Sequence, residues 1–455
     1  MKRNNKNPIV RNIISVALIC IVCILFLSFL LQGNTDNNYE QESMNNPNKK
    51  LQISSINVPE QQWNTTWGGS GYDSAIDIAL DSSNNIYITG TYNATEEPPS
   101  STIGDIVLLK YNSLGEFQWN KTWGGSGKDT GRAIAVDSSN NIYLVGSAAG
   151  GDIVFLKYNS LGELQWDKSW SSSGIGYAIT LDLVGNIFIA GGQSGDMILW
   201  KFNSLGVYQW ERTWGGINTD TGWTMTVDSS NNIYVAGLTY NILPDIDLFL
   251  LKYNSSGVLQ WDSTWGGSGF EDAHSIALDS SNNIFVAGET NSFGAGSYDL
   301  SLVKFNSSGQ LQWNKTWGGS DSELGWDMLA LDSSSNIYLA AHTSSFGAGL
   351  YDGILVKYNS MGQQQWNTTW GGSGDDEFAS IIVDSSNNIF LVGKTDSFGA
   401  GGDDVVLIKY GKGPVDNGSE QIPWYVLFLL VGTICVATAI VTAIVIKKRN
   451  KSIIS

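Results

Sequence analysis

The chain has few residues of the kinds that cross-link small secreted domains or carry out acid–base catalysis. It contains 3 cysteines and 2 histidines in 455 residues. The cysteines, Cys20, Cys23 and Cys435, all lie within apolar runs near the two ends, so the polar region between them has neither disulfides nor thiolate metal sites. A region of roughly 350 residues can bury a sufficient core without such cross-links.

Basic residues are also scarce outside the ends. Residues 1–12 and 447–455 each hold four lysines and arginines and no acid, which leaves 17 of the 25 bases against all 43 acids in between. The negative field of this central region repels phosphate backbones, which argues against a nucleic-acid partner. Cations, or a partner with a basic face, are compatible with it.

Two apolar runs, residues 13–31 and 423–446, are long enough to span a bilayer as helices. The first is longer than the apolar core of a typical cleavable signal peptide and is not followed by an A-x-A-like site, so we expect an uncleaved anchor. A cleaved signal peptide is the alternative. The flanking bases predict that both termini are cytoplasmic and that everything between the runs lies outside the cell membrane.

This topology divides the chain into segments with different expected roles. Residues 1–12 and 447–455 are predicted cytoplasmic ends, the Asn-rich residues 32–60 and the polar residues 411–422 are predicted linkers, and residues 61–410 form the predicted folded domain. Eight Asn-x-Ser/Thr sequons between the apolar runs suit an extracellular glycoprotein, although a composition this rich in Asn, Ser and Thr produces many by chance.

One unit recurs seven times between residues 62 and 410. Its clearest mark is a pair of tryptophans four residues apart, and these pairs account for 14 of the 18 tryptophans. Successive pairs are 44 to 56 residues apart, which is typical of propeller blades. We expect the pairs to have a structural role; they are Trp63 and Trp67, Trp119 and Trp123, Trp166 and Trp170, Trp210 and Trp214, Trp261 and Trp265, Trp313 and Trp317, and Trp366 and Trp370.

Each unit contains four strand-like pieces bounded by Gly, Asn, Asp or Ser. In the unit after Trp265 these pieces are residues 273–278, 284–288, 299–305 and 312–319. We interpret them as strands a, b, c and d of a four-stranded blade. The third unit departs from the pattern around residues 171–172 and 183–185, which predicts a distorted third blade.

The ends of the array predict how the ring closes. The last unit stops near Tyr410 without a Gln-Trp strand, whereas the first is preceded by an unpaired one that starts at Gln62. An N-terminal strand that completes the last blade would close the ring and remove exposed sheet edges. The predicted fold is therefore all-β, a single seven-bladed propeller of four-stranded blades closed by its N-terminal strand and flanked by two transmembrane helices.

The repeat is similar to a known family. The segments Trp-Gly-Gly-Ser-Gly, Ile-Ala-x-Asp-Ser-Ser-Asn-Asn-Ile-Tyr and Lys-Tyr-Asn-Ser-x-Gly, as found between Trp123 and Gly162, resemble the seven-bladed β-propeller (SBBP) repeat of archaeal and bacterial surface proteins. The resemblance covers about three quarters of the chain. It implies the fold but no general activity.

Loops of two kinds suggest where a site could lie. The a–b and c–d turns are short and uniform, whereas the d–a and b–c loops vary, for example at Tyr92–Gly104 and Tyr240–Asp245, so we expect recognition on the d–a/b–c face. Six residues after the second tryptophan, six of the seven units carry an acid: Asp73, Asp129, Asp220, Glu271, Glu323 and Asp376.

These six acids form a predicted acidic ring that either binds a cation such as calcium or accepts hydrogen bonds from its own Gly-rich loops. The Asp-Ser-Ser-Asn-Asn segments that start at Asp81, Asp137, Asp228, Asp279 and Asp384 lack the alternation of a calcium loop and are interpreted as hairpin turns.

The sequence favours binding over catalysis. Its histidines, His274 and His342, occur near no recognisable nucleophile motif, so we predict no catalytic residue and no cofactor. The expected function is a cell-surface binding, adhesion or structural scaffold module with a protein or glycan ligand. One alternative is a quinoprotein-like oxidoreductase, because Gly115 followed by Trp119 resembles the tryptophan docking of those propellers. Another is a surface enzyme with carboxylate chemistry.

Overall fold

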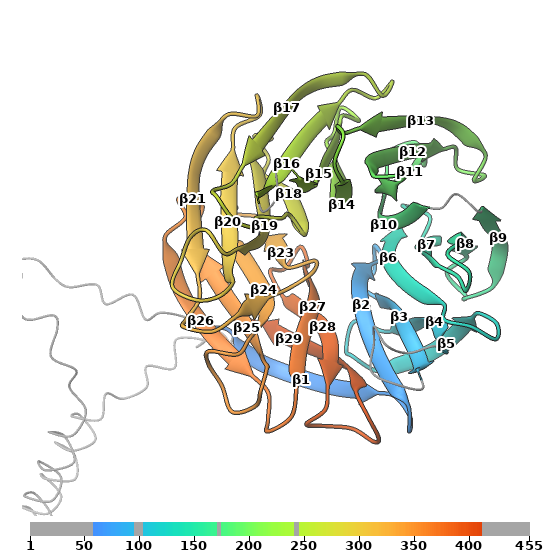
Figure 1. Ribbon diagram of the computed structural model, residues 1–455. Helices are drawn as coiled ribbons and strands as arrows, with labels where there is room; N and C mark the ends of the chain where they lie inside the picture. Colours follow the sequence, from blue (N-terminus) through green and yellow to red (C-terminus); the bar gives the residue numbers. More distant parts are fainter. Residues whose placement is uncertain (1–57, 95–102, 171–173, 241–244, 412–455) are drawn as a thin grey trace, which may run out of the picture. The chain divides into compact units, whose positions relative to one another are not determined.

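The computed structural model describes residues 58–94, 103–170, 174–240 and 245–411, which form seven β-sheets around a central axis (Figure 1). Both apolar runs, residues 13–31 and 423–446, lie outside these residues, as do nearly all of both linkers. None of the residues that the structure describes forms a helix of the length and apolar character that a membrane span needs. The prediction of an all-β, seven-bladed propeller is confirmed.

Each blade is a meander of antiparallel strands, with strand a at the axis and strand d at the rim (Figure 1). Blades 1 and 2 comprise β2 (Tyr72–Leu80), β3 (Ile86–Ala94), β4 (Asp105–Tyr111) and β5 (Phe117–Trp123), then β6 (Thr130–Val136), β7 (Ile142–Ser147), β8 (Ile153–Tyr158) and β9 (Leu164–Trp170). Blades 3 and 4 comprise β10 (Gly174–Leu181), β11 (Ile187–Gln193), β12 (Asp196–Phe202) and β13 (Tyr208–Trp214), then β14 (Asp220–Val227), β15 (Ile233–Tyr240), β16 (Ile246–Tyr253) and β17 (Leu259–Trp265).

The remaining blades follow the same order. Blades 5 and 6 comprise β18 (Ser275–Leu278), β19 (Ile284–Thr290), β20 (Asp299–Phe305) and β21 (Leu311–Trp317), then β22 (Glu323–Leu324), β23 (Leu329–Leu331), β24 (Ile337–Thr343), β25 (Asp352–Tyr358) and β26 (Gln364–Trp370). Blade 7 comprises β27 (Asp376–Val383), β28 (Ile389–Thr395), β29 (Asp404–Gly411) and β1 (Glu60–Trp67).

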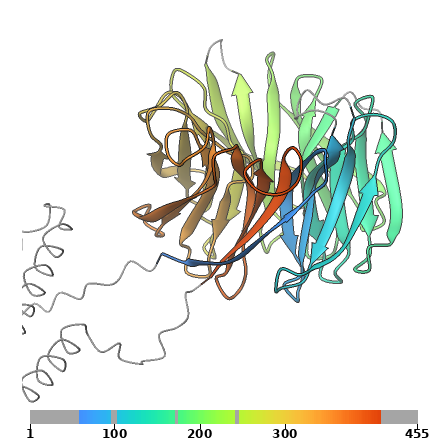
Figure 2. The same ribbon diagram turned by 90° about the horizontal axis from the view of Figure 1, so that it is seen from below.

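The two ends of the described chain close the ring. Strand β1 pairs antiparallel with β29, with Gln61 opposite Tyr410 and Trp67 opposite Val405. Figures 1 and 2 show β1, in blue, lying along the outer edge of the orange blade. The predicted closure by the N-terminal strand is confirmed, and β29 is not left as an open edge.

Hairpin turns join strands a and b. In the first, Asp81 Oδ1 accepts hydrogen bonds from the backbone N–H of Ser83 at 2.8 Å and of Asn85 at 2.9 Å, while Asn84 adopts a positive φ of 59°. Asn tolerates this left-handed conformation better than most residues, and Asp closes such turns through its side chain. The interpretation of these segments as turns is therefore confirmed.

The core lies between blades rather than within them. One cluster, for instance, joins Tyr87 and Leu108 of blade 1 to Leu144 and Leu156 of blade 2. The first tryptophan of each pair helps to cover this core. Trp119 lies 2.9 Å from the position that a Cβ on Gly162 would occupy, so the c–d turn of the next blade packs directly on the indole.

This packing gives the tryptophan pairs a shared environment. Trp170 has no described side chain, and each of the other thirteen is buried or half-buried. The spacing of glycine and tryptophan that resembles quinoprotein docking thus corresponds to inter-blade contacts, here between Gly115 and Trp63 and between Gly162 and Trp119.

Strand a is interrupted in blades 5 and 6. In blade 5 Glu271 forms an isolated bridge with Thr290 before β18, and in blade 6 the strand is split into β22 and β23. Blade 3, which was predicted to be distorted, has four complete strands in its described residues, and residues 171–173 lie outside them. In every blade except the sixth a glycine of strand b lies opposite strand a, where a Cβ would come within 1.8 to 2.3 Å of a carbonyl oxygen, and blade 6 carries Ala341 at this position. Because blade 5 keeps Gly288 there, the added carbon of Ala341 does not by itself explain the interruption.

Substituting Trp119 with Ala should lower the free energy of unfolding by about 3 kcal/mol, the lower end of the range for a large aromatic, because this ring is only half-buried. Chemical denaturation would measure the change. The control is Phe117→Ala on the same strand, whose ring is 47% exposed and whose loss should cost much less. Wild-type stability of Trp119→Ala would contradict the packing role and would favour an indole exposed for sugar stacking.

Candidate functional site at the mouth of the central channel

A β-bulge near the start of strand a places one side chain of each blade at the channel. In five blades the strand pairing skips this residue, for example Arg132 between Gly131 and Ala133. In blades 5 and 6 the corresponding residues precede β18 and lie between β22 and β23. We call these seven residues the bulge ring: Ile76, Arg132, Tyr177, Trp223, His274, Trp326 and Ala379.

The bulge follows from the sequence of the paired strand. A Cβ on Gly146 would lie 2.3 Å from the carbonyl oxygen of Thr130, so only glycine permits this close approach of strands a and b. The extra residue of the bulge is left without a partner, and its side chain is turned out of the sheet. The alternation of side chains between the two faces of strand a is therefore interrupted at the bulge, and the bulge position accepts residues of any character.

Members of the bulge ring surround a cavity of about 230 Å³. Four aromatic side chains form part of its wall: the ring centroids of Tyr177 and Trp223 are 4.1 Å apart, those of Trp223 and His274 5.5 Å, and those of His274 and Trp326 5.2 Å. The Arg132 guanidinium lies 4.9 Å from the Tyr177 centroid in a cation–π contact. Trp326 is 52% exposed, so the wall is accessible from solvent.

Two carboxyl groups lie one residue further along strand a, and both line the cavity. The Ser380 hydroxyl lies 3.0 Å from Asp77 Oδ1 and 3.1 Å from Asp327 Oδ2. Asp327 also accepts a hydrogen bond of 2.6 Å from Ser275 Oγ, and Asp77 accepts one of 2.8 Å from the Ile134 N–H. The other blades carry Ala, Thr or Ser at this position.

The two carboxyl groups are difficult to ionise together. Burial, and then repulsion from Asp327, raise the pKa of Asp77 well above its usual value. Burial also raises the pKa of Asp327, against the hydrogen bonds from Ser275 and Ser380. Two neighbouring carboxyl groups in such a site share protons as a unit.

His274 has its own acidic partners behind the aromatic wall. Its Nε2 lies 2.7 Å from Asp272 Oδ2, and Glu289 accepts a hydrogen bond of 2.9 Å from the Gly325 N–H. Burial opposes a charge on the imidazole, but Asp272 and the other nearby carboxyl groups raise the pKa of His274 overall. Burial and the neighbouring Asp272 raise the pKa of Glu289 to about 7. Ligand atoms of these three residues lie within 4.8 Å of one another, close enough to hold a metal ion.

The predicted acidic ring lies at the start of strand a and does not line the cavity. All six carboxylates are buried, and each accepts a hydrogen bond of 2.6 to 2.9 Å from the second glycine of the preceding Trp-Gly-Gly. The other oxygen of several binds the b–c loop, as in the 2.9 Å bond from Ala149 N to Asp129 Oδ1. The acids thus join two loops of their blade, and a cation at this ring stays a prediction.

Sequence reasoning missed the bulge ring and the acids beside it. It singled out His274 only for the lack of a nucleophile motif, and it named none of the other cavity-lining residues. The available signal was the variation at one repeat position: the residues at the bulge position of strand a are Ile, Arg, Tyr, Trp, His, Trp and Ala in order. Such variation within a uniform repeat indicates a position that the fold does not constrain.

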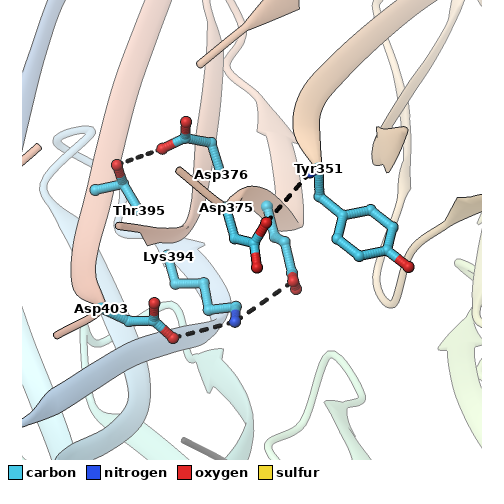
Figure 3. Close-up of polar contacts among 7 residues, drawn as sticks. Tyr351, Asp375, Asp376, Lys394, Thr395 and Asp403 are labelled. Carbon is cyan, nitrogen blue, oxygen red and sulfur yellow. Dashed lines mark hydrogen bonds and ion pairs between the residues drawn. The ribbon is translucent and has the colours of Figure 1, made fainter. Parts of the chain in front are cut away.

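A second polar cluster lies on blade 7. Figure 3 shows Lys394 beside Asp403 and near Asp375. The ammonium is 3.1 Å from Asp403 Oδ2 and 3.4 Å from Glu377 Oε1, and it is largely buried. His342, on the neighbouring β24, is also buried; burial and then Lys394 lower the pKa of His342 to about 4. This histidine is neutral near pH 7.

Comparison with protein families supports the repeat. The family model described as a β-propeller repeat, SBBP, matches residues 118–153 and 266–294. An uncharacterized WD repeat-containing protein of Acanthamoeba polyphaga mimivirus is 22% identical over 410 residues, covering 70% of this chain and 29% of the relative. The regulatory protein FlaEY of Caulobacter vibrioides is 28% identical over 115 residues, covering 22% of this chain and 12% of that protein. The chain thus matches only a minor part of either relative.

Solved structures show the same architecture at low identity. The RRP9 WD40 repeats superpose with a TM-score of 0.52 at 11% identity, covering 78% of this chain and 99% of that one. The Pan2 WD40 domain of Neurospora crassa gives 0.50 at 10% identity, covering 79% and 97%. At such identities the likeness concerns the fold alone.

His342 should make stability depend on pH. Because its pKa is lower in the folded than in the unfolded chain, where it is about 6.5, its contribution is complete above pH 6.5 and is lost as the pH falls toward 4. We expect wild type to lose up to about 3 kcal/mol relative to His342→Phe over this interval, measured by denaturation at each pH.

The comparison with His342→Phe is needed because His274 acts in the opposite direction and is present in both proteins. Parallel pH profiles for the two proteins would show that His342 is freely protonated in the fold.

Proposed function

We propose that this chain, which carries β-propeller repeats of the SBBP family, is a membrane-tethered binding module whose ligand enters the pocket formed by the bulge ring. The observation that carries the proposal is the contrast between a uniform scaffold and one non-uniform cluster. Arg132, Tyr177, Trp223, His274 and Trp326 converge on one cavity from five consecutive blades. Concave sites in which aromatic side chains and a few polar groups converge are typical of ligand binding.

The b–c loops contribute less to recognition than their position suggests. In blades 5, 6 and 7 they share the sequence Ser-Phe-Gly-Ala-Gly, and Phe293, Phe346 and Phe398 pack on the neighbouring tryptophans with centroid distances of 5.3 to 5.4 Å. These loops are therefore alike and fixed. The longer loops at Tyr92–Gly104 and Tyr240–Asp245 lie largely outside the described residues. The bulge ring is the better source of specificity.

The described chain begins and ends on the face opposite the pocket. Glu60 pairs with Gly411 at the end of blade 7 at which strands c end and the c–d turns begin. The bulge ring lies near the start of strand a, toward the opposite face, so neither end of the described chain lies at the pocket.

A carboxylate enzyme is the second candidate, and the Asp77–Asp327 pair favours it. Two carboxyl groups that share a proton, one acting as acid and the other as base, recur in hydrolases. The Ser380 hydroxyl contacts both groups in this cavity. Turnover of a glycan or peptide that is lost in Asp77→Asn and Asp327→Asn would favour this candidate.

Binding to the pocket is tested by screening the full chain in detergent against glycan and protein collections and repeating each positive result with Trp326→Ala. We expect at least a tenfold loss of affinity, because an aromatic anchor of the wall is removed. The control is Tyr208→Ala, a ring of equal exposure, 52%, on the outer strand β13. Ligands that bind equally to all three proteins would exclude the pocket as the binding site.

A further inference from the structure

We propose that the ligand of the bulge-ring pocket is an organic cation, an ammonium or guanidinium group held between the Trp223 and Trp326 rings and the carboxyl groups of Asp77 and Asp327. This inference rests on the proposed function and names the ligand class of the same site. The ammonium could belong to a small free molecule or to a basic side chain of a peptide, and the chemistry of recognition is shared.

The aromatic wall suits a cation. The faces of tryptophan and tyrosine carry negative electrostatic potential, and they attract ammonium and guanidinium groups within about 6 Å of the ring centroid. Arg132 already uses Tyr177 in this way at 4.9 Å. Trp326, in contrast, is 52% exposed and has no cation–π contact among the described residues, so one face of the wall is open to a ligand.

The carboxyl pair provides negative charge for a cation in the buried part of the pocket. Asp77 and Asp327 accept hydrogen bonds from hydroxyl groups and backbone N–H groups, and the described residues provide no lysine or arginine within ion-pairing distance of either. A cation between them would compensate the repulsion that now disfavours the second negative charge. A neutral sugar would not compensate this repulsion between the carboxyl groups.

The charges that face the carboxyl pair from the surrounding strands are few. His274, which is paired with Asp272 and lies near Glu289, comes from blade 5, and its positive charge partly opposes the rise in the pKa of Asp327 that burial causes. Arg132 comes from blade 2 and contacts Tyr177. Binding of a cation should therefore shift a proton from the Asp77–Asp327 pair to solvent. Affinity should rise with pH while that proton is released.

Two unpaired hydrogen-bond donors in the pocket indicate a second feature of the ligand. The buried Nε of Arg132 and the buried Nε1 of Trp223 have no hydrogen-bond partner among the described residues, and both residues line the cavity. Unpaired donors are costly in a buried site, so the ligand should place an acceptor oxygen near its cationic group. Choline meets this description through its hydroxyl group, whereas lysine and arginine derivatives offer a backbone carbonyl at the other end of the side chain.

The test is titration calorimetry on the full chain in detergent. The probes are choline, its neutral isostere dimethylbutanol, and the acetylated amides of lysine and arginine. We expect one or more cations to bind at least tenfold more tightly than the neutral isostere. Repeating the titration in buffers of different ionisation enthalpy should reveal proton release. Choline alone would indicate a small free ligand, and the amides a basic peptide.

Matched variants locate the site. Asp327→Asn and Trp326→Leu should each weaken the bound cation at least tenfold, whereas Asp262→Asn and Tyr208→Leu, exposed on outer strands, should not change it. Circular dichroism confirms that each variant is folded, and Trp326→Leu keeps the test valid if Asp327→Asn unfolds.

Three results would overturn the cation proposal. Equal binding of choline and its isostere, or cation binding that both pocket variants leave unchanged, would each do so. So would failure of every cation to bind at millimolar concentration. A pocket-dependent glycan or protein ligand found in the separate screen would still support the binding function, so the two proposals fail independently.

Discussion

The pairing of β1 with β29 is the contact on which the rest of the structure depends. It joins residues about 350 positions apart in the sequence, Glu60 and Gly411, and gives blade 7 its fourth strand. Every blade then has two neighbours, and each inter-blade cluster is covered on both sides. Without this pairing β29 would be an exposed edge, and the blades next to the gap would lose part of their core. The channel exists only because the ring is closed.

Within the closed ring, a second constraint separates the scaffold from the site. The glycine of strand b lets strand a approach closely enough to form a bulge, and the bulge turns one side chain per blade toward the channel. That side chain packs in no inter-blade core cluster, so its identity has little effect on the fold. In blade 6 strand a is divided, and Trp326 and Asp327 lie in the gap.

Much of the fold could be predicted because its determinants are repeated. Tryptophan pairs such as Trp119 and Trp123 mark strand d in every unit, and Asp81 with Asn84 marks a turn that local side-chain hydrogen bonds explain. The missing last strand and the extra first one predicted the closure. The interruptions of strand a in blades 5 and 6 were not predicted, whereas the departures of the third unit at 183–185 lie in a turn and leave the strand pairing of blade 3 intact.

The site could not be predicted by the same reasoning. Comparison of the repeats reveals the residues that all blades share, whereas the pocket is formed by residues that differ from blade to blade. The acidic ring was conspicuous since it recurs, yet its carboxylates are buried in loop hydrogen bonds such as that from Gly125 to Asp129. Asp77 and Asp327 do not recur, and they meet only because blades 1 and 6 flank blade 7 and its Ser380.

This separation also explains why similarity of fold says little about the ligand. WD40 propellers at 10 to 11% identity share the arrangement of blades, which depends on inter-blade packing and closure. The chemistry of the channel mouth depends on the bulge positions, which packing leaves free. Arg132, Tyr177, Trp223, His274 and Trp326 belong to none of the inter-blade core clusters, yet they converge on one cavity with two carboxyl groups. A group of residues outside the shared core that converges on one cavity is best explained by a ligand.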